Sequence, residues 1–303
     1  MSSRRPTPPA PLVVTLGEAI VALMRHPAQG PGYLGPFASG APCIFAHAAA
    51  RAGCRVRIGM GTGRDDFGEL MTSTLAEAGV EVALAHTDPD RPTASAFVRY
   101  HEDGSRSFIF YLAATAALNY PPERVGPLLA GADWLHISGS TLAFGGTTAT
   151  AAETALEAAH ERGIPVSIDP NVRPEAFDDD LITTLRRHLP RARVVFASTG
   201  ELDALGVDAL DLADQGVTVF DKQGAAGAQV LQGMTWHQVP AIAVDQVDPD
   251  GAGDIFAAAA VAALLAGQDP VAATRYACRA AGESVAHHGP MTSPITRLPA
   301  WEG

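Results

Sequence analysis

Short runs of apolar and β-branched residues alternate with longer helix-forming segments along almost all of this 303-residue chain. The runs typical of strands are 12–16, 55–60, 134–138, 166–169, 194–197 and 217–221. The segments that favour helices are 40–52, 66–78, 147–162, 178–189 and 255–266. Strands that are separated by such helices are joined by right-handed crossovers, so they form a parallel sheet with helices on both faces. The alternation predicts a doubly wound, mostly parallel α/β domain over residues 11–303.

One interval breaks this alternation and predicts a small second sheet. Residues 93–112 contain two β-type segments on either side of Asp103-Gly104, which is a strong signal for a hairpin turn. The stretch at about 30–40, rich in Gly and Pro with aromatic residues between them, is expected to supply another strand. Because an inserted hairpin needs a surface on which to pack, we expect these segments to form a β lid over the carboxyl-terminal edge of the main sheet.

Composition narrows the classes of protein and of partner. The formal net charge of −12 argues against nucleic acid and anionic membranes as partners, since both require a basic face. No run of 18 apolar residues exists that would span a membrane. Cys43, Cys54 and Cys278 are few and far apart, which favours reduced thiols in the cytoplasm over a disulfide or zinc framework. Residues 1–10 are polar and proline-rich and are expected to be a disordered tail, not a signal peptide.

The segment 248–254, Asp-Pro-Asp-Gly-Ala-Gly-Asp, carries the clearest chemistry. A strand-like run at 241–244 precedes it, and the alanine-rich helix follows. Glycines at 251 and 253 let the backbone come close to a ligand, and N–H groups at a helix start stabilise the negative charge of a phosphoryl group. Asp254 is placed to deprotonate an attacking hydroxyl. The pattern predicts a small-molecule kinase, and a glycine turn with a capping Asp is the alternative interpretation.

Two other nucleotide-binding classes lack their sequence patterns. No Gly-x-x-x-x-Gly-Lys loop occurs, which weighs against a P-loop kinase. No Gly-x-Gly-x-x-Gly follows the first expected strand, which weighs against a hydride-transferring dinucleotide enzyme.

The 248–254 segment resembles the signature Asp-Thr-x-Gly-Ala-Gly-Asp of the PfkB carbohydrate kinases, which have the ribokinase-like fold, with Pro249 in place of Thr. An N-terminal signature of the family is similar to residues 39–44 and 61–68, although Ser39 replaces a Gly and Ile44 replaces an Asn. The resemblance runs in order from about residue 12 to 289. It implies phosphorylation of a primary hydroxyl of a small sugar, with ATP and Mg²⁺ as cofactors and K⁺ as a further candidate.

Catalytic and cation-binding roles follow from the same resemblance. It implies that Asp254 takes the proton from the sugar hydroxyl and that Gly251, Ala252 and Gly253 form the anion hole. Asp248 is similar to a monovalent-cation ligand of the family, and a carboxylate of no special role is the alternative interpretation.

Two strand-end segments resemble the family's phosphate and metal sites. The segment 169–173, Asp-Pro-Asn-Val-Arg, is similar to one that holds phosphates and sugar, which makes Arg173 a candidate ligand; an N-cap Asp with a surface Arg is the alternative interpretation. Ser198-Thr199-Gly200-Glu201 resembles an Asn-x-x-Glu motif. It implies that Glu201 holds Mg²⁺ through water and that Ser198 lies at the nucleotide, and a capping box is the alternative interpretation.

The nucleotide side completes this set. Residues 222–227 resemble a hairpin that leaves room for the base and ribose, so Lys222, Gly224 and Gly227 are candidate nucleotide ligands. A plain β-turn is the alternative. Arg279 stands where many members have an Asn near the adenine.

Residues that would bind the sugar match the family less well. Residues 17–22 resemble its first-strand segment, and the resemblance makes Glu18 and Gly40 candidate substrate ligands, but Ala22 stands where many members have an Asp. On the lid, residues 108–112 are similar to a Phe-x-Phe-Tyr-Arg segment of fructokinases and 2-keto-3-deoxygluconate kinases, with Leu112 in place of Arg. The further candidate sugar contacts on the lid are Phe97, Arg99 and Tyr111.

The loss of that Arg bears on the substrate. A buried anion without a partner is costly, so a neutral ketose such as fructose or tagatose is favoured over an acid sugar. Arg99 and Arg106 are the side chains that would compensate. The alternatives are a 2-keto-3-deoxygluconate kinase, a nucleoside kinase, and a non-catalytic nucleotide or sugar sensor. An exposed hairpin edge also favours a homodimer through the lid strands.

Overall fold

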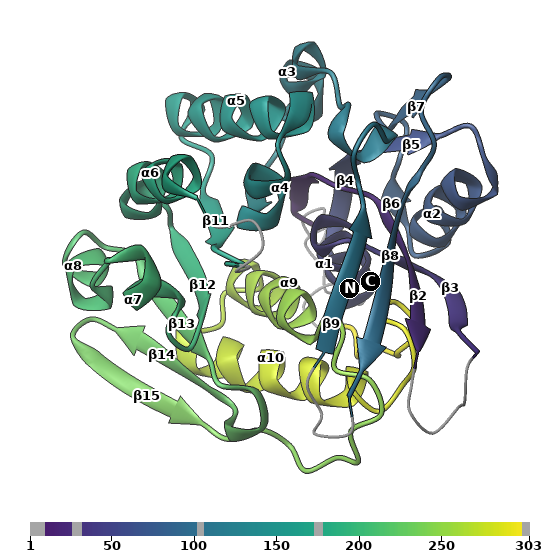
Figure 1. Ribbon diagram of the computed structural model, residues 1–303. Coiled ribbons are helices and arrows are strands. Elements are labelled where there is room, and N and C mark those ends of the chain that lie inside the picture. The colour runs from purple at the N-terminus through teal and green to yellow at the C-terminus, as the bar shows by residue number, and fades with distance from the viewer. Residues whose placement is uncertain (1–9, 26–31, 102–105, 173–177, 299–303) are drawn as a thin grey trace, which may run out of the picture.

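The computed structural model describes residues 10–25, 32–101, 106–172 and 178–298. A nine-stranded sheet runs through it in the order β15-β14-β13-β12-β11-β10-β1-β4-β6 (Figure 1). Neighbouring strands are parallel except where β13, β14 and β15 pair antiparallel at one edge. The strands are β1 (Leu12–Leu16), β4 (Arg55–Gly59), β6 (Val80–Glu81), β10 (Trp134–Ser138), β11 (Val166–Asp169), β12 (Val194–Ser198), β13 (Thr218–Lys222), β14 (Ala228–Gln232) and β15 (Thr235–Val239).

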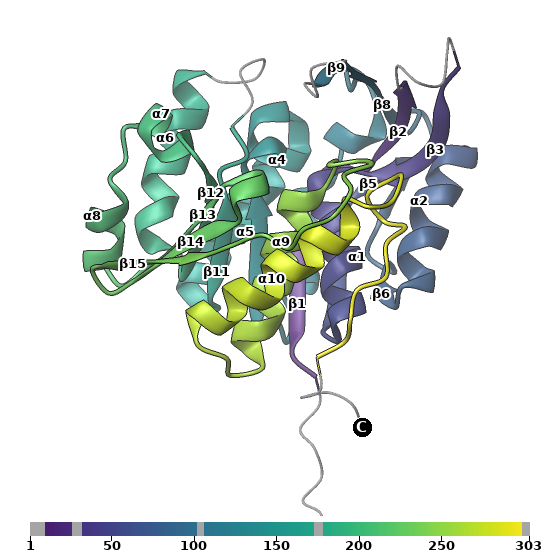
Figure 2. The same cartoon turned by 90° about the horizontal axis from the view of Figure 1, so that it is seen from below.

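Helices cover both faces of this sheet (Figure 2). Alternate strand residues enter opposite cores, so Val13 belongs to the core on one face and Val14 to the core on the other. The first face holds α1 (Ala41–Ala52), α2 (Asp66–Glu77), α9 (Ala252–Leu265) and α10 (Pro270–Ser284). The second holds α3 (Val125–Leu128), α4 (Gly139–Phe144), α5 (Gly146–Arg162), α6 (Asp179–His188), α7 (Glu201–Leu205) and α8 (Ala209–Asp214). The predicted doubly wound fold class is confirmed.

One predicted strand is wrong. The run 241–244 has strand-like composition, but the chain from 240 to 249 forms no helix or strand. Pro240 directly follows β15 and has no N–H to donate to a sheet ladder. The segment therefore leaves the sheet and crosses to α9 as an irregular connection.

A separate four-stranded sheet forms the lid, in the order β3-β2-β8-β9. Its strands are β2 (Ile20–Arg25), β3 (Leu34–Ser39), β8 (Ala94–Tyr100) and β9 (Arg106–Tyr111). β2 and β8 are parallel, and the two outer pairs are antiparallel. Three of these strands come from the segments that were expected to supply a lid. The predicted tail lies almost wholly outside the described residues, as do Asp103 and Gly104.

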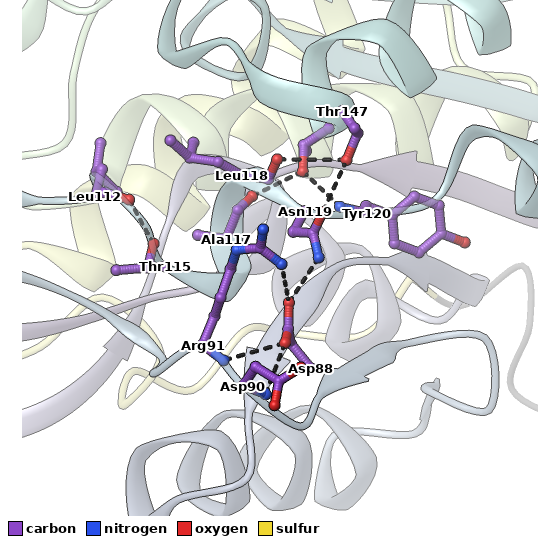
Figure 3. Close-up of polar contacts among 11 residues, drawn as sticks. Asp88, Asp90, Arg91, Leu112, Thr115, Ala117, Leu118, Asn119, Tyr120 and Thr147 are labelled. Atoms are coloured by element: carbon purple, nitrogen blue, oxygen red, sulfur yellow. Dashed lines mark hydrogen bonds and ion pairs between the residues drawn. The ribbon is translucent and has the colours of Figure 1, made fainter.

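Two carboxylates, Asp88 and Asp65, hold the chain segments that lead into and out of the lid strands β8 and β9. Asp88, in β7 (His86–Asp88), accepts hydrogen bonds from the Asp90 and Arg91 N–H groups, the Arg91 guanidinium and the Asn119 amide, at 2.6–3.1 Å (Figure 3). Asp65 caps α2 through the Gly68 N–H and also accepts from the N–H and hydroxyl of Thr93, at 2.7–2.8 Å. The predicted 61–68 motif thus holds the chain where it enters β8.

The Asp88 cluster is expected to make the stability of the protein depend on pH. The backbone N–H of Asp90 is the main cause that lowers the pKa of Asp88, and Asn119 and Arg91 add to it. A lowered folded pKa stabilises the protein above the unfolded value of about 3.9, and the contribution is lost as the pH falls toward the folded pKa. We expect Asp88→Ala to lower the free energy of unfolding by about 2–3 kcal/mol at neutral pH.

Urea denaturation at several pH values checks this expectation. The difference between the wild type and Asp88→Ala should shrink below about pH 4, as Asp88 becomes protonated in the unfolded chain. Asp90→Ala is the matched control, because its side chain is exposed on the same loop. A difference that stays constant down to acid pH would contradict the assigned role of the carboxylate.

The cysteines are buried and make no disulfide. Burial raises the pKa of Cys54 to about 12 and that of Cys278 to about 11. Within the described residues, no helix combines the length and the apolar character needed to cross a membrane.

Candidate active site

The lid faces the carboxyl-terminal ends of the main-sheet strands across a cleft of about 280 Å³. Doubly wound folds place their ligand sites at this edge of the sheet. The two walls differ in chemistry. The lid wall is mostly apolar and includes Ile20, Ala22, Ala96, Val98, Phe108 and Phe110. The main-domain wall is polar and includes Asp169, Asn171, Ser198, Glu201, Lys222 and the residues from Gly251 to Asp254.

The start of α9 lies on the main-domain wall. Gly251 precedes the helix with a φ of 73°, and a Cβ there would lie 2.7 Å from Pro290 Cβ. Because the N-cap residue is a glycine, no capping side chain bonds the N–H groups of the first turn. Asp254 lies in that turn, is 9% exposed and lines the cleft. The structure therefore brings a carboxylate and a helix N-terminus together, as the sequence predicted.

Lys222 adds a cation beside this helix start. It is the only lysine in the sequence, and a Cβ on Gly253 would lie 3.4 Å from its Nζ. Its ammonium group forms a buried ion pair with Asp169. Burial lowers the pKa of Lys222, but the charges of Asp169 and Glu201 outweigh burial, so the net pKa is above its usual value. The lysine therefore stays charged in the cleft.

Glu201 joins two strand ends beside this pair. Its carboxylate oxygens accept hydrogen bonds from the Val172 N–H at 2.8 Å and the Ser198 N–H at 2.7 Å. The bond to Ser198 joins residues three apart, as in a capping box, but α7 begins at Glu201 with Gly200 as its N-cap, so the capping-box interpretation is not met. Burial and the charge of Asp169 raise the pKa of Glu201. A buried carboxylate, Asp169, beside a partly buried one, Glu201, makes this wall attractive to a cation.

Glu18 and Gly40 lie together where the lid joins the main domain. Glu18 is 2% exposed, and its oxygens accept hydrogen bonds from the Ser140 and Thr141 hydroxyls, each at 2.7 Å. Gly40 has a φ of 101°, and a Cβ there would lie 2.4 Å from the Glu18 carbonyl oxygen. Sequence reasoning missed Ser140 and Thr141. Their position directly after β10, at the carboxyl edge of the sheet, was the available signal.

Three predicted sugar ligands on the lid do not line the cleft, which corrects the sequence analysis. Phe97, Arg99 and Tyr111 point to the opposite face of the lid sheet, because side chains alternate along a strand and Ala96 and Phe110 take the inward positions. The rings of Phe97 and Tyr111 pack edge to face with their centroids 5.6 Å apart, and Tyr111 is 59% exposed.

The remaining predicted site residues differ in whether they line the cleft. Ser198 lines the cleft, but Gly224, Gly227 and Arg279 do not. Arg279 is an exposed residue of α10 that pairs with Glu283 at 2.8 Å. Gly227 has a φ of 97°, and a Cβ there would lie 2.1 Å from the Val239 carbonyl oxygen, so glycine is required by the backbone of the hairpin. Arg173 lies outside the described residues.

Comparison with known proteins agrees with this arrangement. Residues 12–297 match the model of the pfkB family carbohydrate kinases. The chain belongs to this family. A fructokinase of Klebsiella pneumoniae is 34% identical over 262 residues, which cover 83% of each chain.

Two solved fructokinases share the fold. The fructokinase of Xylella fastidiosa with bound ATP is 26% identical, with a TM-score of 0.81 over 93% of this chain and 94% of that one. A double mutant of the Vibrio cholerae fructokinase has fructose, ADP and a potassium ion bound. It is 29% identical, with a TM-score of 0.83 over 95% of this chain and 96% of that one. The predicted ribokinase-like fold is confirmed, and the protein is a sugar kinase.

Proposed function

We propose that this kinase transfers the γ-phosphoryl group of ATP to a primary hydroxyl of a neutral ketose such as fructose or tagatose. The observation that carries the proposal is the placement of Asp254, the start of α9 and Lys222 on one wall of the cleft. A general base, backbone donors and a cation are the groups that phosphoryl transfer to an alcohol requires.

Each group has a distinct role in the reaction. Asp254 takes the proton of the sugar hydroxyl as its oxygen forms a bond to the γ-phosphorus. The bond from that phosphorus to the bridging oxygen of ADP breaks, and ADP leaves. The N–H groups from Gly251 to Gly253 and the Lys222 ammonium group stabilise the charge on the transferring group. The lid wall excludes water, which limits hydrolysis of ATP.

Glu201 and Asp169 fit a hydrated Mg²⁺ ion. Both Glu201 oxygens already accept backbone N–H groups, so the carboxylate would hold the ion through water. The described residues contain no group of three His, Cys, Asp or Glu side chains that would bind a metal directly. When bound with ATP, Mg²⁺ would neutralise phosphate charge.

The charges around the cleft favour a neutral sugar. Arg106 lines the cleft, but its guanidinium pairs with Asp250 at 3.4 Å. Arg99 is exposed on the other face of the lid and offers no compensation for Leu112. Ala22 and Ile44 add apolar surface where many members have polar residues. Arg106 is the one observation that favours the second candidate, a 2-keto-3-deoxygluconate kinase.

A substrate panel at saturating ATP tests the proposal. ADP release is measured with fructose, tagatose, other polyols, 2-keto-3-deoxygluconate and nucleosides. We expect the highest kcat/KM with a neutral ketose. A higher kcat/KM with the acid sugar or a nucleoside would replace the substrate in the proposal. Binding of nucleotide and sugar without ADP release on any of them would favour the sensor.

We also propose that the protein forms a homodimer through its lid and works in the cytoplasm. On the outer face of the lid, the side chains of Tyr33, Ile109 and Tyr111 are 49%, 61% and 59% exposed to solvent. Exposed apolar groups on an open sheet favour pairing with a second copy. Sedimentation of the purified chain as a monomer at micromolar concentration would contradict the dimer.

A further inference from the structure

Asp248 is surrounded by hydrogen-bond donors of the protein itself. Its carboxylate is 3% exposed. One oxygen accepts from the Tyr100 hydroxyl at 2.5 Å and from the Asp250 N–H at 2.9 Å. The other oxygen accepts from the Gly289 N–H at 2.8 Å. These bonds fix the first residue of the loop that ends at the anion hole.

The Tyr100 bond crosses from the lid to the main domain. Tyr100 ends β8, and Arg106, which pairs with Asp250, begins β9, so both strands contact the same loop. In Figure 1 these ends of β8 and β9 lie beside the connection that leads into α9. Residues 148 positions apart are thereby joined. The lid therefore sets the position of the loop 248–251.

These donors do not suit a bound monovalent cation. A carboxylate has about four acceptor positions. In Asp248, three of these positions already accept a hydrogen bond from an N–H or O–H group. Burial is the main cause that raises the pKa of Tyr100 far above its usual value, and Asp248 adds to it. The phenol therefore stays protonated and donates. The role implied for Asp248 by resemblance, a K⁺ ligand, disagrees with this geometry.

We propose that Tyr100 is a positioning residue whose hydroxyl occupies the Asp248 carboxylate in place of a monovalent cation, so that this kinase works without K⁺. The inference rests on the proposed function, because the loop that Tyr100 holds carries Gly251 and leads to Asp254. The hydrogen bond from a lid hydroxyl to this buried carboxylate also links the position of the lid to the shape of the anion hole.

Tyr100→Phe tests this proposal, because it removes the hydroxyl and keeps the ring. Tyr111→Phe is the matched control, since it makes the same change on the outer face of the lid, outside the cleft, and keeps the apolar ring that the proposed dimer would bury. Each protein is assayed in KCl and in choline chloride at equal ionic strength. Two quantities are measured: the melting temperature without substrates, and kcat and KM with the best acceptor of the panel.

We expect the wild type and Tyr111→Phe to have the same kcat within about twofold in both salts. In choline chloride, the kcat of Tyr100→Phe should fall by about tenfold or more. The loss of one hydrogen bond to a charged group changes an equilibrium by roughly this factor. KCl should restore the kcat of Tyr100→Phe and raise the melting temperature of this variant alone. A conservative change with a merely structural role would not create a response to K⁺.

Other results would overturn the inference. A wild type that needs K⁺, or whose melting temperature rises in KCl but not in choline, binds the cation despite Tyr100. A Tyr100→Phe variant that matches Tyr111→Phe, or that is equally impaired in both salts, also overturns it. If no variant phosphorylates any acceptor, the proposed function fails, while the melting temperatures still decide the role of Tyr100.

Discussion

Asp254→Asn is expected to lower turnover by roughly 10²–10⁴ while it leaves nucleotide binding nearly intact, which is the range for loss of a general base. Asparagine has almost the same volume as aspartate, so the start of α9 should keep its shape. It cannot accept the proton of the sugar hydroxyl. The buried position of Asp254 on the cleft wall makes replacement of its function by solvent inefficient.

Steady-state kinetics and calorimetric titration with ATP measure the two quantities separately. Asp245→Asn is the matched control, because Asp245 is exposed on the connection that precedes the cleft loop. That variant should keep wild-type turnover. Near-normal turnover of Asp254→Asn would rule out the assigned base, and a large loss of ATP affinity would show that the residue acts mainly on the nucleotide.

The features that local sequence determines were predicted well. The alternation of strands and helices, and the placement of Asp254 at a helix start, depend on residues close together in the chain. Asp169, Ser198 and Lys222 each end a strand, and the strand ends of a parallel sheet meet at one edge, so the structure brings them to one wall of the cleft. Side-chain roles at these positions came from resemblance and remain proposals.

The features that were missed depend on contacts between distant residues. Resemblance placed Tyr111 in the sugar site, but the face that it takes is set by the pairing of β8 with β9, in which Ser95 lies opposite Tyr111. A strand reverses the direction of its side chain at each residue, so a motif match without a register cannot assign a face. The bond from Tyr100 to Asp248 likewise has no local signal.

The run 241–244 shows the same limit in the backbone. Its residues favour a strand, yet a strand exists only where a neighbour offers hydrogen bonds. β15 is the last strand of the sheet, and Pro240 ends it. The irregular path then brings Asp248 under the lid, so the failure of the local prediction coincides with a connection between the two sheets.

Lys222→Met is the second change with a large expected effect. It removes the only lysine from beside Gly253 and leaves the Asp169 carboxylate, which is 1% exposed, without its partner. Breaking a buried ion pair from one side costs about 3–5 kcal/mol of folding stability. Loss of a cation at the transferring phosphoryl group should also reduce kcat by roughly 10²–10³. Chemical denaturation and steady-state kinetics measure the two losses.

A double variant separates the structural part of this loss from the catalytic part. Lys222→Met combined with Asp169→Asn removes both charges, so much of the lost stability should return, since a buried carboxylate no longer lacks a partner. Turnover should stay low, because no cation remains beside the N–H groups of α9. Asp169→Asn alone is measured beside it, because Asp169 is also proposed to hold Mg²⁺ through water. Lys222→Arg, which keeps the charge, should retain more activity than Lys222→Met. Recovery of turnover together with stability in the double variant would show that Lys222 serves only to neutralise Asp169.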